Sequence, residues 1–130
     1  MNKIKANIGT ELYKTEIESE TNLIISDEPK SSGGQDLGFA PNELLASSLA
    51  ACTAITLRMY ANRKGWELTD VKVEVSFETD SVQSKFKIVR DIQLLGNLDE
   101  DQQARLLIIA DKCPIHKILT NPIEITTALN

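Results

Sequence analysis

The succession of sequence patterns predicts an α+β fold with a mainly antiparallel sheet. Short alternating segments come first and one long apolar helix pattern follows. Two long alternating segments, a second helix and a last alternating segment complete the chain. Strands that follow one another closely can pair as antiparallel neighbours, and separate runs of strands and helices are typical of α+β proteins. The 130 residues are enough for one domain, 1–130, with its own hydrophobic core.

Residues 2–26 predict a small antiparallel meander. Apolar and polar residues alternate in 4–8, a Gly-Thr pair offers a turn, and the runs 12–17 and 22–26 continue the alternation. A period of two over short runs indicates half-buried strands. Residues 27–41 contain most of the Gly and Pro of the first half and predict a long loop. Its Gly-Gly pair lacks the G-x-x-x-x-G-K-[ST] context of a phosphate site, so a plain loop is favoured.

Residues 42–64 carry the strongest helix pattern in the chain. We expect Asn42 as the N-cap and Gly65 just past the C-terminus. The residues expected on the inward face recur at three- and four-residue steps: Leu45, Leu49, Cys52, Thr56 and Met59. The uncharged apolar stretch Leu44–Leu57 is shorter than the roughly 20 residues that a membrane span needs. We therefore expect a central, buried helix and no membrane association.

Residues 66–78 and 85–95 predict a long hairpin, whose connection begins at 79–81. Val, Ile, Leu and Phe alternate with polar residues in both segments. Arg90 shares the face of the apolar residues in the second segment. Such an arginine either lies at an edge of the sheet or reaches a polar partner, and we favour the edge. Residues 96–97, Gly-Asn, are expected to form a turn.

The last third of the chain predicts a helix, a very short helix and a strand. Asp99 is expected to cap a helix over 100–112, with a glutamine at the third helical position completing a variant of the capping box. A proline can begin a short helix over 114–119, with Cys113 as its N-cap. Alternating apolar residues in 123–127 predict a final strand.

The composition argues against several classes of function. The net charge is −5 and the basic residues are scattered, so we expect no nucleic-acid partner. No apolar segment of the secretory type follows the first residues, and we expect a cytoplasmic location. In a reducing cytoplasm a disulfide is more often transient than structural.

The two cysteines, Cys52 and Cys113, are the residues that suggest chemistry. The thiolate is the reactive form, so the question is what lowers each pKa. Cys113 has the better local case, because it is the expected N-cap of a helix and has Lys112 and His116 beside it. Cys52 has only nearby hydroxyl groups. Two inert core cysteines are an alternative that local chemistry slightly favours. A zinc site of Cys113, His116 and Cys52 lacks ligands for a usual structural set, so we expect neither metal nor cofactor.

Five segments of the sequence resemble the OsmC/Ohr family. They are PNELL at 41–45, AACT at 50–53, LRMYA at 57–61, KGW at 64–66 and CPI at 113–115. The order of elements also agrees, so the resemblance covers nearly the whole chain, and it is closest to the general OsmC-like branch. It implies curved, mainly antiparallel sheets around a long central helix, in an intertwined homodimer.

The resemblance also implies a function. It implies a thiol-dependent peroxidase that reduces organic hydroperoxides and, less readily, hydrogen peroxide. By position, Cys52 would be the peroxidatic thiol, which becomes a sulfenic acid, and Cys113 would be the resolving thiol. A small dithiol such as a lipoyl group, or another cellular thiol, would reduce the resulting disulfide. This order of roles reverses the ranking that local sequence gives to the two thiols.

The chain departs from the family pattern at two positions. Family peroxidases pair the first cysteine with an arginine from the N-terminal strands, whereas no arginine precedes Arg58 here. They also carry a glutamate ten residues before the cysteine, where this chain has Asn42, and Glu43 follows. Glu43 is thus a tentative catalytic residue, or a first-turn acid that favours the helix dipole. These departures leave two alternatives open: a catalytically weak stress or ligand-binding protein, and a thiol exchanger or sensor.

Overall fold

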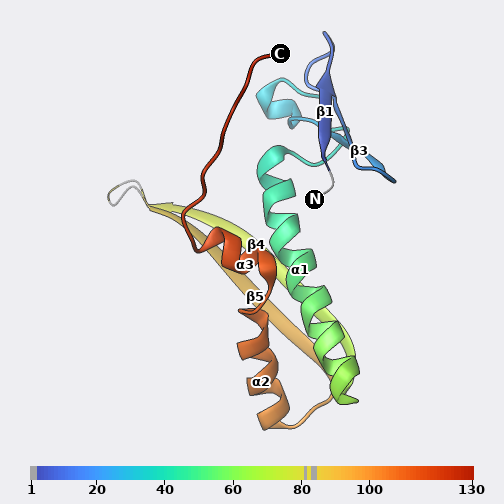
Figure 1. Ribbon diagram of the computed structural model, residues 1–130, viewed down its shortest axis with the longest axis vertical. Coiled ribbons are helices and arrows are strands. Elements are labelled where there is room, and N and C mark those ends of the chain that lie inside the picture. Colours follow the sequence, from blue (N-terminus) through green and yellow to red (C-terminus); the bar gives the residue numbers. More distant parts are fainter. Residues whose placement is uncertain (1–2, 81, 83–84) are drawn as a thin grey trace. The chain divides into compact units, whose positions relative to one another are not determined.

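The computed structural model describes residues 3–80, 82 and 85–130, and confirms the predicted α+β class (Figure 1). Residue 2 of the expected meander and residue 81 of the expected connection fall outside this range, and residues 79–80 of that connection belong to a strand instead. In chain order the elements are β1 (Lys5–Ile8), β2 (Thr15–Glu18), β3 (Leu23–Ser26), the 3-10 turn η1 (Lys30–Ser32), α1 (Pro41–Lys64), β4 (Glu67–Asp80), β5 (Lys85–Asn97), α2 (Glu100–Ala110) and α3 (Pro114–Leu119). The chain forms two compact units, Met1–Leu45 and Ala46–Asn130.

The first unit contains the predicted antiparallel meander, in the order β1-β2-β3. Ile17 in β2 lies opposite Ala6 in β1 and Ile24 in β3. The loop after β3 is fastened by buried Asp27, whose carboxylate accepts four backbone N–H bonds of 2.7–3.2 Å. The donors are Tyr13, Glu28, Gln35 and Leu37. This long loop is therefore ordered by polar contacts rather than by an apolar core.

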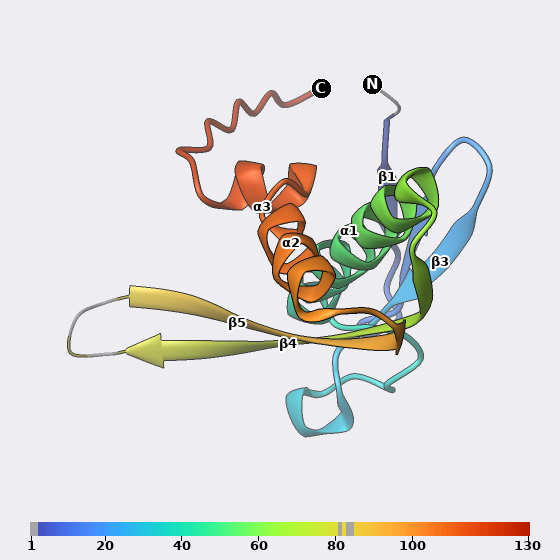
Figure 2. The same ribbon diagram turned by 90° about the horizontal axis from the view of Figure 1, so that it is seen from below.

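The second unit is built on the predicted hairpin of β4 and β5. Its register runs from the pair Glu67 and Asn97 to the pair Asp80 and Lys85. Most of α1, together with α2, lies on one face of this ribbon (Figure 2). The turn expected at 96–97 is wrong, because Gly96 belongs to β5 and has a φ of 136°. A Cβ there would lie 1.9 Å from the Glu67 carbonyl oxygen, so the strands approach too closely for any residue but glycine.

The hydrophobic core of the second unit forms where both helices meet the ribbon. Its buried members come from α1, β4 and α2: Leu57, Tyr60, Ala61, Leu68, Leu106, Ile109 and Ala110. The predicted inward face of α1 was partly wrong. Leu45 is 42% exposed and Met59 is 67% exposed, whereas Thr53 and Leu57 are fully buried. Because α1 is apolar on nearly every side, its periodicity could not identify the buried face.

Helix α1 is long and apolar enough, by length and composition, to cross a membrane. The helix spans 24 residues, so it extends beyond the uncharged stretch Leu44–Leu57 at both ends. The core helix of a soluble protein passes the same test, and α1 contributes buried side chains to the core just described.

The C-terminal region differs from the sequence prediction. The strand expected at 123–127 is wrong, because these residues are exposed and form no described β-pairing. Alternation favours a strand, but a strand also needs a neighbour with which to exchange backbone hydrogen bonds. Helix α2 keeps its predicted Asp99 cap and capping box but ends at Ala110 rather than Lys112.

Candidate thiol site

The fold of the second unit brings together the two thiol groups that the sequence singled out. Cys52 lies in the middle of α1 and is partly exposed, and Cys113 is the fully buried N-cap of α3. Both are free thiols. Their side chains form a hydrogen-bonding interaction with each other, and the Ile115 backbone N–H interacts with both sulfurs. The fold thereby brings together two thiols that lie 61 positions apart in the sequence.

The surroundings of the two sulfurs shift the pKa values of the thiols in opposite directions. Burial raises the pKa of Cys52, and its bond to Cys113 raises the pKa further. The Ile115 N–H and the Thr56 hydroxyl oppose this only in part, so the pKa lies above its ordinary value. The surroundings of Cys52 therefore favour its protonated form over its thiolate.

Cys113 is the thiol on which the negative charge is stabilised. Burial raises the pKa of Cys113, but donors around the sulfur outweigh that cost and hold its pKa below its ordinary value. The donors are the Cys52 thiol, the backbone N–H groups of His116 and Ile115, and the Thr53 hydroxyl. This order of the two pKa values is the one that local sequence favours, although the contribution of His116 comes from its backbone rather than its ring.

Arg90 is a residue of this site that the sequence analysis undervalued. Its side chain is only 13% exposed. It donates from Nη1 to the Thr53 hydroxyl oxygen at 3.1 Å and to the Ala110 carbonyl at 3.3 Å, and from Nη2 to Asp111 at 2.7 Å. Arg90 therefore reaches polar partners, and it also lies on an edge strand, because the sheet of β4 and β5 has two strands. The signal was present in the alternation, which placed a charge on the apolar face of β5.

Glu43 has a structural contact of its own. Helix α1 begins at Pro41, so Asn42 is not the N-cap. Proline suits the first helical position because it lacks the N–H that would be unpaired there. Glu43 is exposed, and its Oε1 accepts a 2.9 Å bond from the backbone N–H of Ala40. This is the glutamate half of a capping box. The catalytic role implied for Glu43 stays a prediction.

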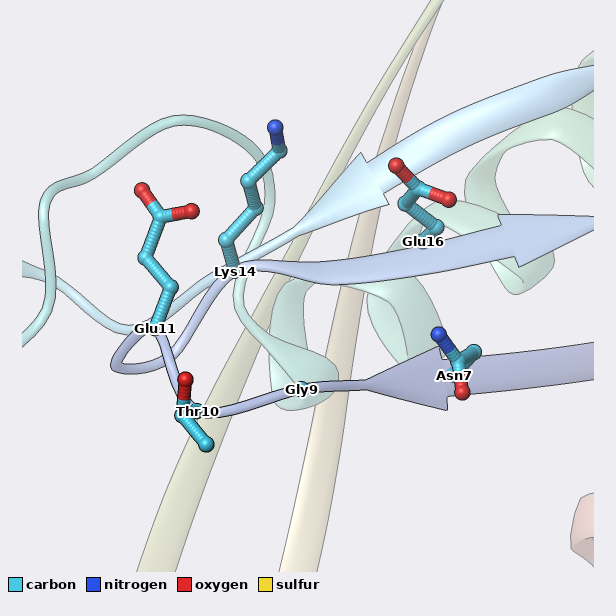
Figure 3. A pocket seen from close by; sticks show the side chains of 6 residues that line it. All are labelled: Asn7, Gly9, Thr10, Glu11, Lys14 and Glu16. Atoms are coloured by element: carbon cyan, nitrogen blue, oxygen red, sulfur yellow. The ribbon is translucent and has the colours of Figure 1, made fainter.

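The described residues offer no cluster of three or more His, Cys, Asp or Glu side chains for a metal ion. A polar pocket of about 300 Å³ lies in the first unit, beside the segment that joins β1 to β2 (Figure 3). Its lining residues are Asn7, Gly9, Thr10, Glu11, Lys14 and Glu16. The pocket presents charges of both signs and contains neither cysteine, so it is distinct from the thiol pair.

Comparison with known proteins agrees with the architecture. The model of the OsmC-like protein family matches residues 33–128. A Psychrobacter arcticus protein assigned to the osmotic stress and detoxification response is 25% identical, with a TM-score of 0.76, 91% of this chain covered and 88% of the other. An OsmC-like protein from Mycoplasma pneumoniae is 21% identical, with a TM-score of 0.77 and coverages of 92% and 87%.

A third solved structure carries a functional name. The organic hydroperoxide resistance protein OsmC from Legionella pneumophila is 25% identical, with a TM-score of 0.66 and coverages of 92% and 88%. No curated protein gives a significant match. The family model spans most of the chain, and the long central helix and antiparallel sheets are those of these structures. This protein therefore belongs to the OsmC-like protein family.

Proposed function

We propose that this protein is a thiol-dependent peroxidase that reduces organic hydroperoxides, and hydrogen peroxide less readily, in the cytoplasm. The observation that carries the proposal is the direct interaction between the partly exposed Cys52 thiol and the buried Cys113 thiol. The name of the Legionella relative, an organic hydroperoxide resistance protein, supports the substrate class. The active form would be the family's homodimer.

Cys52 is the attacking thiol in this proposal, because it is the member of the pair that solvent reaches. Its proton passes along the thiol–thiol bond to Cys113, and the Cys52 thiolate attacks a peroxide oxygen. A sulfur–oxygen bond forms as the oxygen–oxygen bond breaks. The alkoxide that leaves takes the proton from Cys113 and becomes an alcohol. Cys52 is then a sulfenic acid and Cys113 is a thiolate again.

Cys113 completes the oxidative half of the cycle. Its thiolate attacks the Cys52 sulfur, a disulfide forms, and the hydroxide that leaves takes up a proton to become water. The two thiols have then supplied the two electrons that reduced the peroxide. A small dithiol of lipoyl type, or another cellular thiol, returns the disulfide to two thiols by exchange and is itself oxidised.

The decisive experiment compares the two serine variants in peroxide consumption with a dithiol reductant. We expect Cys52→Ser to lower the rate by roughly 10³-fold or more, the scale seen when a nucleophile is removed. Without the reductant, Cys113→Ser should still consume about one equivalent of peroxide per chain, more slowly because the proton acceptor of Cys52 is gone, and should then stall at the sulfenic acid because no thiol resolves it. Equal rates for Cys52→Ser and the native protein would rule out the assignment.

The raised pKa of Cys52 favours a second candidate, a catalytically weak stress or ligand-binding protein of the same fold. A poorly ionised thiol attacks peroxides slowly. Free thiols counted before and after one equivalent of an organic hydroperoxide separate the two candidates. Loss of two thiols per chain, with a disulfide between Cys52 and Cys113, supports the peroxidase. Retention of both thiols supports the weaker protein.

A further inference from the structure

The Thr53 hydroxyl stands between a fixed positive charge and a sulfur. It is fully buried in α1 and has three neighbours that can share a hydrogen bond with it. They are the Leu49 carbonyl at 2.7 Å, the Arg90 guanidinium at 3.1 Å and the Cys113 sulfur. A hydroxyl has one proton to donate and two lone pairs. The way in which the proton and the lone pairs are shared among the three neighbours decides whether the Cys113 sulfur receives a hydrogen bond.

Arginine fixes half of that assignment. A guanidinium can only donate, so the Thr53 oxygen must accept from Arg90. The one hydroxyl proton is then directed either to the Leu49 carbonyl or to the Cys113 sulfur. In an α-helix the Leu49 carbonyl also accepts from the Thr53 amide, so it keeps a partner when the hydroxyl turns away. The hydroxyl can therefore follow the charge on the sulfur and leave no buried group unpaired.

Arg90 has two further hydrogen-bond partners that fix the position of its guanidinium. Asp111 binds its Nη2, and the Ala110 carbonyl accepts from its Nη1. The same carbonyl accepts the Cys113 N–H at 3.3 Å. One guanidinium thus ties β5 to α1 and to the turn that carries Cys113. A donor that polarises the hydroxyl also makes it a stronger donor toward an anion.

We propose that Arg90 is the positioning residue of the thiol pair: acting through the Thr53 hydroxyl, it holds Cys113 as a thiolate in reach of Cys52. This inference rests on the proposed function, since the thiolate is what resolves the Cys52 sulfenic acid. Arg90 touches neither peroxide nor sulfur in this scheme. The N-terminal strands of this chain contain no arginine. Arg90 supplies a cation from β5 instead, and it acts on the second thiol.

The first test needs no peroxide. In a Cys52→Ser background, the ultraviolet absorbance of the Cys113 thiolate is followed as pH rises, for Arg90→Gln, Arg90→Lys, Thr53→Val and Thr53→Ser. The charged and titratable groups linked to Arg90 are then Asp111, at 2.7 Å, and His116, whose Nδ1 lies 3.8 Å from Asp111 Oδ1. We expect Arg90→Gln and Thr53→Val to move the titration to higher pH, Thr53→Ser to leave it in place, and Arg90→Lys to give an intermediate result.

A matched control removes a different arginine. Arg63 lies over the Tyr60 ring at the end of α1 and is exposed. If Arg63→Gln moves the titration as far as Arg90→Gln, the effect is one of net charge and the proposal is wrong. An unmoved titration in both Arg90→Gln and Thr53→Val also overturns it. Thr53→Val is nearly isosteric, so it decides the matter even if Arg90→Gln does not fold.

The second test follows one turnover in the protein with both cysteines. We expect Arg90→Gln to slow disulfide formation on the order of 10-fold, the effect of about one net hydrogen bond. In a Cys113→Ser background, adding Arg90→Gln should change the rate at which the Cys52 sulfenic acid is trapped by less than about 2-fold, because Arg90 acts on the other thiol. Failure to consume peroxide would defeat the proposed function alone, and the titration would still decide the role of Arg90.

Discussion

Two charged side chains organise polar clusters in the two units, and they do so in different ways. Asp27 in the first unit collects four backbone N–H groups, none of which can give up its proton. Arg90 in the second unit contacts a hydroxyl that itself contacts a thiol, and both of those can move a proton. Each cluster satisfies a buried charge. Only the second contains thiol and hydroxyl protons that can move between neighbouring side chains.

The difference teaches where function can be sought in this fold. A carboxylate that holds amides fixes a loop, because the arrangement has a single low-energy state above its pKa. A guanidinium that holds a hydroxyl has two states, since the hydroxyl proton has two acceptors within reach. The Asp27 cluster therefore serves as structure, and we assign the chemistry to the Arg90 cluster.

Removal of the Asp27 carboxylate should produce the largest effect in this comparison. Asp27→Ala leaves four backbone amides without their acceptor. We expect hydrogen exchange at those amides to speed up by on the order of 10²-fold. The matched control is Asp36→Asn in the same loop, an exposed residue whose φ of 57° asparagine also tolerates. Unchanged exchange at Gln35 and Leu37 in Asp27→Ala would contradict the structural role.

Acid should weaken the first cluster over a defined range of pH. Burial alone raises the pKa of Asp27, but the four N–H bonds lower it below its ordinary value of 3.8. A depressed pKa adds stability that is fully present above the unfolded value and is lost as pH falls through the folded value. We expect amide exchange in the 27–38 loop to accelerate only below about pH 4. In Asp27→Asn that acid-dependent increase should disappear, and its persistence would point to another carboxylate.

Local sequence rules predicted the individual elements well. The capping box at Asp99, the glycine after α1 and the proline that begins α3 all follow from backbone chemistry within a few residues, and all are present. The face that α1 buries did not follow, because the choice depends on which side the ribbon and α2 cover. The strand expected at 123–127 failed for the same reason, since a neighbour cannot be read from one segment.

The sequence predicted several residues of the site but not the contacts between them. The two cysteines stood out by motif, but their interaction is a product of the tertiary fold. Arg90 was visible as a charge on an apolar face, yet its partners lie 20 to 37 positions away along the chain. Asp27 looked like an ordinary loop residue, because nothing in its neighbours marks a carboxylate that will be buried with four donors. Burial of a charge with its partners is decided by packing.

Asp111 should show the smallest effect, because its side chain is 63% exposed. Its bond to Arg90 is short, but solvent screens an ion pair at such a position. We expect Asp111→Asn to slow disulfide formation in a single turnover by less than about 3-fold, and added salt to shrink the difference. Asp101→Asn in the exposed first turn of α2 is the matched control and should change nothing. A loss as large as that of Arg90→Gln would mean that Arg90 cannot hold Thr53 without this carboxylate, and that the guanidinium owes its position to Asp111 rather than to the Ala110 carbonyl.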